Sequence, residues 1–257
     1  MAATPQGNVI QEMQANANVE KITNVVDREF SSDTGFWGRG NIGGTVTIVG
    51  GVCHSTNITN GYDILYTGLS NAGVKWYKIT FTVLNYVSGG VAVNISDSPG
   101  PIVSTNGRFI HYVKDNSGYG YFRLRAQNSP FTGDIDNVSI QEVGWAGSQE
   151  LYDGIFNQRK ALGDTDEQAT YAAVKAAAMW CHYNNSVDNG AIHGKLYNWF
   201  VVKLLQMDID YYNAANPSTP WGWRVPTQAD FNTLATTLGG TNVAGGKLKK
   251  EGTRIVC

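Results

Sequence analysis

The sequence predicts a mainly β protein with a smaller α+β part: an N-terminal β-sandwich or jelly roll, followed by a second domain that contains helices. Two observations carry this prediction. Between residues 24 and 143, short segments rich in β-branched and aromatic residues alternate with turn-forming residues. Near residue 144 this pattern stops, and an alanine-rich segment and a capped helical segment follow.

The chain begins with a polar segment, residues 1–23, in which Val9, Ile10 and Met13 have loosely helical spacing. A segment of this composition cannot bury much apolar surface by itself. We expect it to be an arm that docks to another protein, with disorder as the alternative.

Seven strands are expected in the first domain, residues 24–143. They are TVTIV (45–49), YDILY (62–66), VKWYKITFTV (74–83), GVAVNIS (90–96), RFIHYVK (108–114), YGYFRLRA (119–126) and DIDNVSIQEV (134–143). In the third of these, alternate residues from Tyr77 to Val83 are apolar, whereas Lys78, Thr80 and Thr82 between them are polar. A period of two indicates a half-buried antiparallel strand, and many such strands without a helix indicate a sandwich.

The second domain is expected over residues 164–257, after a linker at 144–163 that begins GWAGSQ. Residues 164–180 form an alanine-rich helical segment in which Asp164 and Glu167 have the spacing of a capping pair. Another helix is expected after Thr227, with Asp230 completing its cap and two glycines at 239–240 ending it.

Composition excludes several function classes. The formal net charge of −2 gives no electrostatic reason to expect nucleic acid as a partner. The N-terminus has neither the basic nor the apolar region of a secretion signal, and no apolar run approaches the roughly 20 residues of a membrane helix. We therefore expect a protein made in the cytoplasm, without membrane insertion.

The stretch WCHYNNSVDNGAIHGKLYNWF (180–200) places Cys181 and His182 side by side, with His193 nearby. A zinc site needs three or four ligands, and there is no second thiol close in sequence. Adjacent residues on an extended chain point in opposite directions, so this thiol and imidazole are poorly placed for nucleophilic catalysis. Packing is the preferred interpretation of this stretch, with metal binding or catalysis as the alternative.

The motifs WCHYNN, GKLYNW, GWRVPT and GGKLKKEG resemble the Fibrobacter succinogenes major paralogous domain over residues 165–252. This resemblance implies a C-type-lectin-like fold related to the formylglycine-generating enzyme, with the aromatic residues of these motifs in or near the core. The catalytic cysteines of that enzyme lie beyond the matched motifs, so the resemblance implies no catalysis here. Because domains of this kind usually continue past GGKLKKEG, this one is expected to be incomplete and to need a partner.

The segments NVVDREFSSDTGFWGRGN and FTGDIDNVSIQEV bracket a module similar to carbohydrate-binding jelly rolls of phage tail and fibre proteins. Sugar binding uses flat aromatic faces together with a few hydrogen-bonding groups. The candidate ligand-binding residues are Trp37, Tyr62, Tyr66, Trp76, Tyr86, Tyr119 and Tyr121. Core packing is the alternative for each of them. Trp76 is the strongest candidate, because it lies on the polar face of its strand.

The same resemblance implies a structural calcium ion, for which Glu29 and Asp136 occupy the matching places. Calcium takes six to eight oxygen ligands, and these residues supply two carboxylates. No other cofactor is expected.

These observations predict a non-enzymatic phage virion fibre or adhesin that displays binding domains toward the bacterial surface. Its N-terminal arm would bind other virion proteins, and a homotrimer would bind host glycans or proteins with avidity. A capsid-decorating head fibre is the alternative among binding proteins. A glycan-active enzyme is the alternative from another class, but the sequence shows no carboxylate pair for it.

Overall fold

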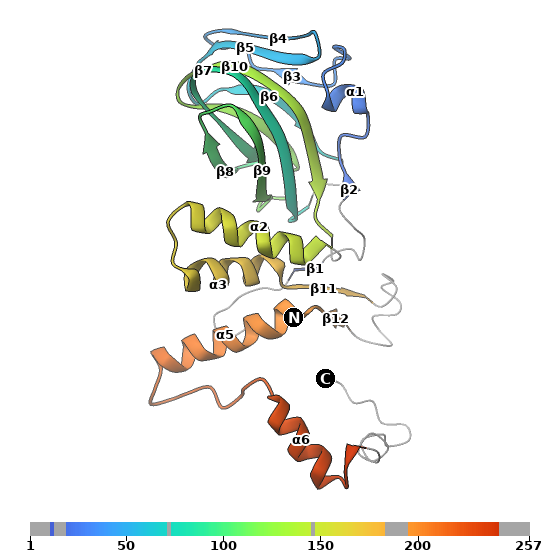
Figure 1. Cartoon of the computed structure of the whole chain (residues 1–257), viewed down its shortest axis with the longest axis vertical. Coiled ribbons are helices and arrows are strands. Elements are labelled where there is room, and N and C mark those ends of the chain that lie inside the picture. The colour runs from blue at the N-terminus through green and yellow to red at the C-terminus, as the bar shows by residue number, and fades with distance from the viewer. Residues whose placement is uncertain (1–10, 13–18, 71–72, 145–146, 183–194, 242–257) are drawn as a thin grey trace. The chain divides into compact units, whose positions relative to one another are not determined.

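The structure, a computed structural model, describes residues 11–12, 19–70, 73–144, 147–182 and 195–241 (Figure 1). The chain divides into two compact units. One comprises Met13–Ala177, and the other combines Met1–Glu12 with Ala178–Cys257. Each unit is described by itself.

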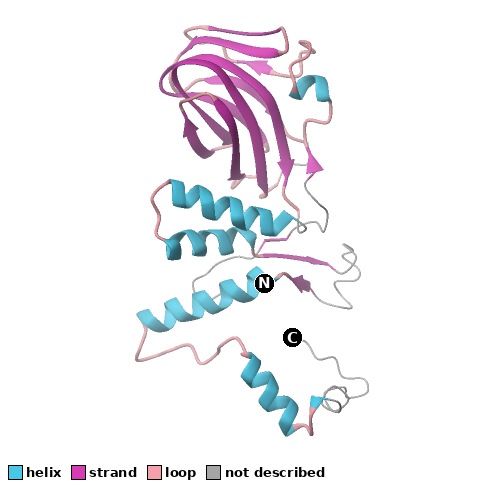
Figure 2. Ribbon diagram, viewed as in Figure 1, coloured by secondary structure: helices cyan, strands magenta, loops and turns pink. Residues whose placement is uncertain are grey.

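The first unit is built on a nine-stranded antiparallel sheet that bends into a sandwich (Figure 2). Its strands are β2 (Val19–Glu20), β3 (Gly38–Arg39), β4 (Thr45–Val49), β5 (Val52–Ile58), β6 (Asp63–Gly68), β7 (Trp76–Ile95), β8 (Ser98–Val103), β9 (Gly107–Lys114) and β10 (Tyr121–Glu142). A short helix, α1 (Val25–Arg28), follows β2.

Two long strands, β7 and β10, belong to both layers of the sandwich. Near the middle of β7, Gly89 has a φ of +77°, and the β7–β10 register shifts between Gln127 and Thr132. The first half of β7 and the second half of β10 form one layer with β4, β5 and β9. The other halves form the second layer with β3, β6 and β8.

The core lies between the two layers. The alternation predicted for residues 75–83 is confirmed, because Tyr77, Ile79 and Phe81 are fully buried. From the second layer, alternate residues of β10, including Phe122 and Leu124, reach the same core. The predicted mainly β class and the β-sandwich are therefore confirmed.

The predicted strands differ from the observed ones in where strands end and in which segments form strands. The segments 74–83 and 90–96 are one strand, β7, and the segments 119–126 and 134–143 are one strand, β10. The turn-forming residues from Ser88 to Gly90 lie at a bend within β7. Strands β5 and β8 were not predicted, because VCHSTNI and SPGPIV are rich in polar and turn residues.

Most of the predicted linker, 144–163, is helix α2 (Ser148–Ala161), which packs against α3 (Asp166–Ala177). The capping pair predicted for the helical segment 164–180, which is α3 in the structure, was one residue out of register. The side chain of Thr165 accepts from the backbone N–H of Gln168, and the Gln168 side chain accepts from the backbone N–H of Thr165. The capping pair is thus Thr165 and Gln168 instead of Asp164 and Glu167.

In its described residues, the second unit contains a small sheet and two helices. Strand β1 (Gln11–Glu12) pairs parallel with β11 (Met179–His182), which pairs antiparallel with β12 (Lys195–Tyr197). Part of the predicted N-terminal arm is therefore a strand. Helix α5 (Trp199–Ala215) was not predicted, whereas α6 (Gln228–Thr237) has the predicted capping box of Thr227 and Asp230. Among the described residues, no helix is long and apolar enough to cross a membrane.

Candidate functional site

The aromatic candidates occupy very different environments. Trp37 is 4% exposed, its ring lies 5.9 Å from those of Phe30 and Phe122, and its Nε1 donates to the backbone oxygen of Asp27. An indole enclosed in this way offers no face to a ligand. The binding role predicted for Trp37 was wrong, because its large apolar ring completes the core instead.

Three other candidate tyrosines differ in their exposure. Tyr62 and Tyr119 are exposed, and the loop before Tyr119 is held by Asp115, whose carboxylate accepts from the backbone N–H groups of Gly118 and Gly120. Tyr86 is half-buried against the core and donates from its hydroxyl to the oxygen of Gly89.

Trp76 is half-buried at the start of β7. The predicted register is correct, since Lys78 and Thr82 lie on the same face of the strand. That face also holds Tyr112, the cross-strand partner of Lys78, and both side chains bind Glu150 of α2. Helix α2 therefore covers part of the surface for which we predicted sugar stacking.

Two candidates, Tyr66 and Tyr121, come together on the outer face of the second layer. Their ring centroids lie 5.8 Å apart with an interplanar angle of 34°. Gly38 is the cross-strand partner of Tyr66, and a Cβ atom built on Gly38 would lie 2.1 Å from Cε2 of the Tyr66 ring. The ring therefore lies flat over the backbone of β3, so that its opposite face is directed away from the sheet.

Polar side chains surround these two rings. In β10, Arg123 and Arg125 alternate with the buried residues Phe122 and Leu124, so both arginines lie on the outer face with Tyr121. Asn94 of β7 is directly opposite Arg123. We call this surface the tyrosine face and define it by six residues: Asp63, Tyr66, Asn94, Tyr121, Arg123 and Arg125.

The two arginines are held in place by the surrounding chain. Arg123 donates to the backbone oxygen of Ser96, and its guanidinium lies 5.5 Å from the centroid of the Tyr121 ring. Arg125 donates to the backbone oxygen of Gly61, and its Nε lies 3.0 Å from Oδ1 of Asp63. Burial raises the pKa of Asp63, while the positive charges of Arg125 and Arg123 act in the opposite direction.

Four buried polar atoms of the tyrosine face have no well-aligned hydrogen-bond partner within the described residues. Two of them, Nε of Arg125 and Oδ1 of Asp63, face each other as an ion pair. The other two are Nε of Arg123, a donor, and Oδ1 of Asn94, an acceptor. Asn94 is only 7% exposed. Because an unpaired buried polar atom is costly, these atoms need ligand or water as partners.

Comparison with known proteins gives one family match. Residues 155–255 match the Fibrobacter succinogenes major domain. This match supports the resemblance predicted for residues 165–252 and extends it upstream to residues of α2. No curated protein matches the chain.

Solved structures of family 29 carbohydrate-binding modules align with about half of the chain. A lysine-to-alanine mutant of CBM29-2 has 13% identity and a TM-score of 0.31, over 50% of this chain and 90% of the module. An arginine-to-alanine mutant has 10% identity and a TM-score of 0.27, over 52% and 87%. A third family 29 module has 14% identity and a TM-score of 0.27, over 52% and 86%. TM-scores this low support no inference about the ligand of this chain.

The cysteine–histidine stretch lies at the start of the Fibrobacter succinogenes major domain motifs. Cys181 is buried in β11, while His193 lies outside the described residues. Cys53 is also buried, which raises the pKa of its thiol to about 12. Within the described parts of the chain, no three His, Cys, Asp or Glu residues are grouped as metal ligands would be.

The proposed calcium ligands lie close enough to affect each other. Burial raises the pKa of Asp136, and the charge of Glu29 raises it further. Both Asp136 oxygens accept hydrogen bonds from Asn137, one from its backbone and one from its side chain. Calcium binding by Glu29 and Asp136 stays a prediction.

Sequence reasoning missed the arginines and Asn94 of the tyrosine face. A signal for the arginines was present, because the alternation in YFRLRA (121–126) places Tyr121, Arg123 and Arg125 on one face. No signal existed for Asn94, which joins this face only through the pairing of β7 with β10.

Proposed function

We propose that the tyrosine face binds a glycan. The observation that supports this most strongly is the flat seating of Tyr66 over Gly38, beside Tyr121. The outward-directed face of Tyr66, with the Tyr121 ring beside it, offers a platform for the C–H groups of a sugar ring. Loss of one stacking ring at a shallow site costs about 1–3 kcal/mol, tenfold or more in affinity.

The polar groups of the face suit a hydroxyl-rich ligand. Nε of Arg123 can only donate, whereas Oδ1 of Asn94 can only accept. A sugar hydroxyl donates and accepts, so neighbouring hydroxyls of one glycan can pair both atoms. An apolar ligand would leave them unpaired, at a penalty of about 1–3 kcal/mol for each atom.

We further propose that the chain acts by binding and not by catalysis. Glycoside hydrolysis commonly uses two carboxyl groups on either side of the scissile bond. The tyrosine face holds the carboxyl group of Asp63, which is ion-paired with Arg125. A hydrolase activity would appear as reducing ends released from a bound oligosaccharide.

In the wider setting, we propose that the protein is a virion fibre or adhesin of a phage that infects bacteria. A sandwich with a candidate sugar-binding face is followed in this chain by a match to the Fibrobacter succinogenes major domain. This arrangement supports a role in presenting binding surfaces to the host cell. Weak sites repeated in a trimer would gain avidity toward host glycans. Mass spectrometry of purified virions tests this, and the absence of the chain from intact particles would contradict it.

A glycan array tests the binding site directly. The full chain should bind at least one oligosaccharide, and Tyr121→Ala and Tyr66→Ala should each weaken binding about tenfold. Tyr197→Ala is the matched control, because Tyr197 is also a strand tyrosine that solvent reaches, but it belongs to the second unit. Equal losses in all three variants, or none in the first two, would contradict the assignment.

A further inference from the structure

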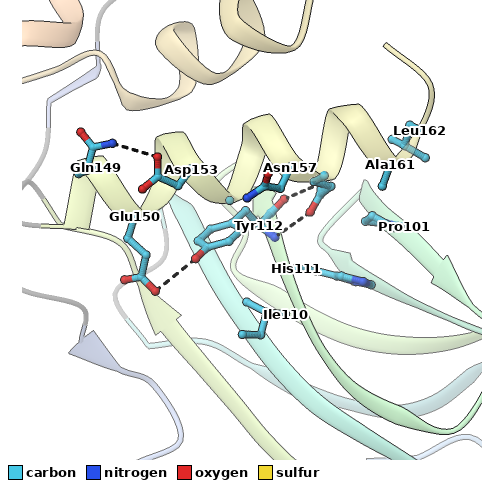
Figure 3. A pocket seen from close by; sticks show the side chains of 12 residues that line it. Pro101, Ile110, His111, Tyr112, Gln149, Glu150, Asp153, Asn157, Ala161 and Leu162 are labelled. Atoms are coloured by element: carbon cyan, nitrogen blue, oxygen red, sulfur yellow. Dashed lines mark hydrogen bonds between the residues drawn. The ribbon is translucent and has the colours of Figure 1, made fainter. Parts of the chain in front are cut away.

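A groove of about 700 Å³ runs along the outer edge of β9, under helix α2 (Figure 3). Its walls include Ile110, His111 and Tyr112 of β9, Pro101 of β8, Ala161 of α2, and Leu162, which caps the C-terminus of α2. Successive residues of a strand point to opposite faces of the sheet. A groove lined by both Ile110 and His111 therefore follows the edge of the strand, where backbone groups are accessible.

A side-chain amide already occupies one position along this edge. Within the described residues, β9 pairs only with β7, so its other side has no neighbouring strand. The backbone N–H of Tyr112 donates to Oε1 of Gln158 over 3.2 Å, and Nε2 of Gln158 donates to the Tyr112 oxygen over 3.3 Å. The amide of Gln158 thus takes the place of a peptide group from an adjacent strand.

The next outward-facing position is open. In an antiparallel ladder, residues alternate between bonding to one neighbour and bonding to the other. Since Tyr112 bonds outward to Gln158, Ile110 also directs its N–H and C=O away from β7. These groups have no partner in the described part of the chain, and the Ile110 side chain is 46% exposed.

Helix α2 makes the other wall because Gly154 lets it approach closely. A Cβ atom on Gly154 would lie 2.0 Å from the Tyr112 ring. Close to this contact, Asp153 accepts from the side chain of Gln149 (Figure 3). No lysine, arginine or histidine of the described residues forms an ion pair with Asp153. The wall therefore presents a carboxylate that has no ion-pair partner among the described residues, beside an open strand edge.

We propose that this edge binds an extended segment of a partner protein, which adds to the sheet as a strand beside Ile110. Main-chain bonds to Ile110 would supply affinity, as in other cases of strand addition. An apolar side chain of the segment would lie against Pro101 and Leu162, and a lysine or arginine would pair with Asp153. A glycan fits less well, because the Tyr112 ring is covered by Gly154 and the walls are mainly apolar.

The test uses a random octapeptide library displayed on messenger RNA and selected on the immobilised full chain. Enriched peptides should carry apolar residues at alternate positions and a basic residue. Ile110→Pro removes an N–H that β7 does not use, so the β7–β9 ladder is retained, and it should weaken binding about tenfold. Ile110→Val is the matched control and should bind as the parent chain does.

A second measurement does not depend on the folding of the proline variant. N-methylation of an enriched peptide, one residue at a time, should abolish binding at alternate residues only, since every second N–H of an added strand faces its neighbour. No enrichment above background, or equal binding by the N-methylated peptides, would overturn the proposal. A concentration-dependent dimer of the parent chain that Ile110→Pro dissociates would also overturn it, because a second copy would then occupy the edge.

Discussion

Acidification should destabilise the sandwich through His111, which is neutral in the folded protein and protonated in the unfolded chain. His111 is 6% exposed, its ring lies 5.6 Å from that of Phe81 in an edge-on arrangement, and its Nδ1 has no partner within the described residues. Burial lowers the pKa of His111 from 6.5 to about 4. The imidazole is therefore neutral in the folded protein at neutral pH.

The sign and size of the effect follow from linkage. Below pH 6.5 the unfolded chain binds a proton at His111 that the folded chain does not bind until about pH 4, so stability falls as the pH drops through this window. A pKa lowered by about 2.5 corresponds to about 3 kcal/mol at full protonation of the unfolded chain. The pKa values of Asp115 and Glu142 are lowered in the folded protein, so these carboxylates stabilise it. That contribution is lost at more acidic pH, when the two groups are protonated.

Urea unfolding between pH 7.5 and pH 4, followed by tryptophan fluorescence, measures this loss. His111→Leu is the comparison, because it retains an apolar side chain at the site and cannot titrate. The difference in unfolding free energy between the parent chain and the variant should change by about 3 kcal/mol across the window. A difference that stays constant with pH would refute the reasoning and place His111 in contact with water.

Three further substitutions test other parts of the structure. Gly38→Ala should displace the Tyr66 ring and weaken glycan binding about tenfold in calorimetric titration; unchanged affinity would mean that the ring position is irrelevant. Glu142→Gln should lower the free energy of unfolding in urea by about 3–5 kcal/mol. The ammonium of Lys21 is buried 2.5 Å from the Glu142 carboxylate, and the substitution leaves it without a negatively charged partner there. Thr227→Ala should destabilise α6 by about 1 kcal/mol through loss of the capping box, visible as faster hydrogen exchange in its first turn.

The fold class was predictable because hydrophobic alternation is a local property. The side chains from Tyr77 to Val83 follow the period of a strand whether or not the rest of the chain is known. The continuation of β7 past Gly89 was not predictable, because a glycine at positive φ marks a bend within a strand as well as a turn. Helix α5 was missed because WFVVKLL is rich in aromatic and β-branched residues, which are typical of strands.

The candidate site was predictable only in part, because it depends on strand pairing. Tyr66 and Tyr121 were both recognised as candidate stacking residues, but their contact requires the pairing of β6 with β10. Composition cannot distinguish an enclosed aromatic residue such as Trp37 from an accessible one, since both serve as large apolar groups. Gly38 was not recognised, since its role is to leave room for a ring on the next strand.

A crystal structure of the full chain with its best array oligosaccharide tests the central claim most directly. We expect a sugar ring stacked on Tyr66 and Tyr121, with hydroxyl groups within hydrogen-bond distance of Nε of Arg123 and Oδ1 of Asn94. Electron density for the oligosaccharide in the second unit, or at the exposed Tyr119 with the tyrosine face empty, would contradict the account.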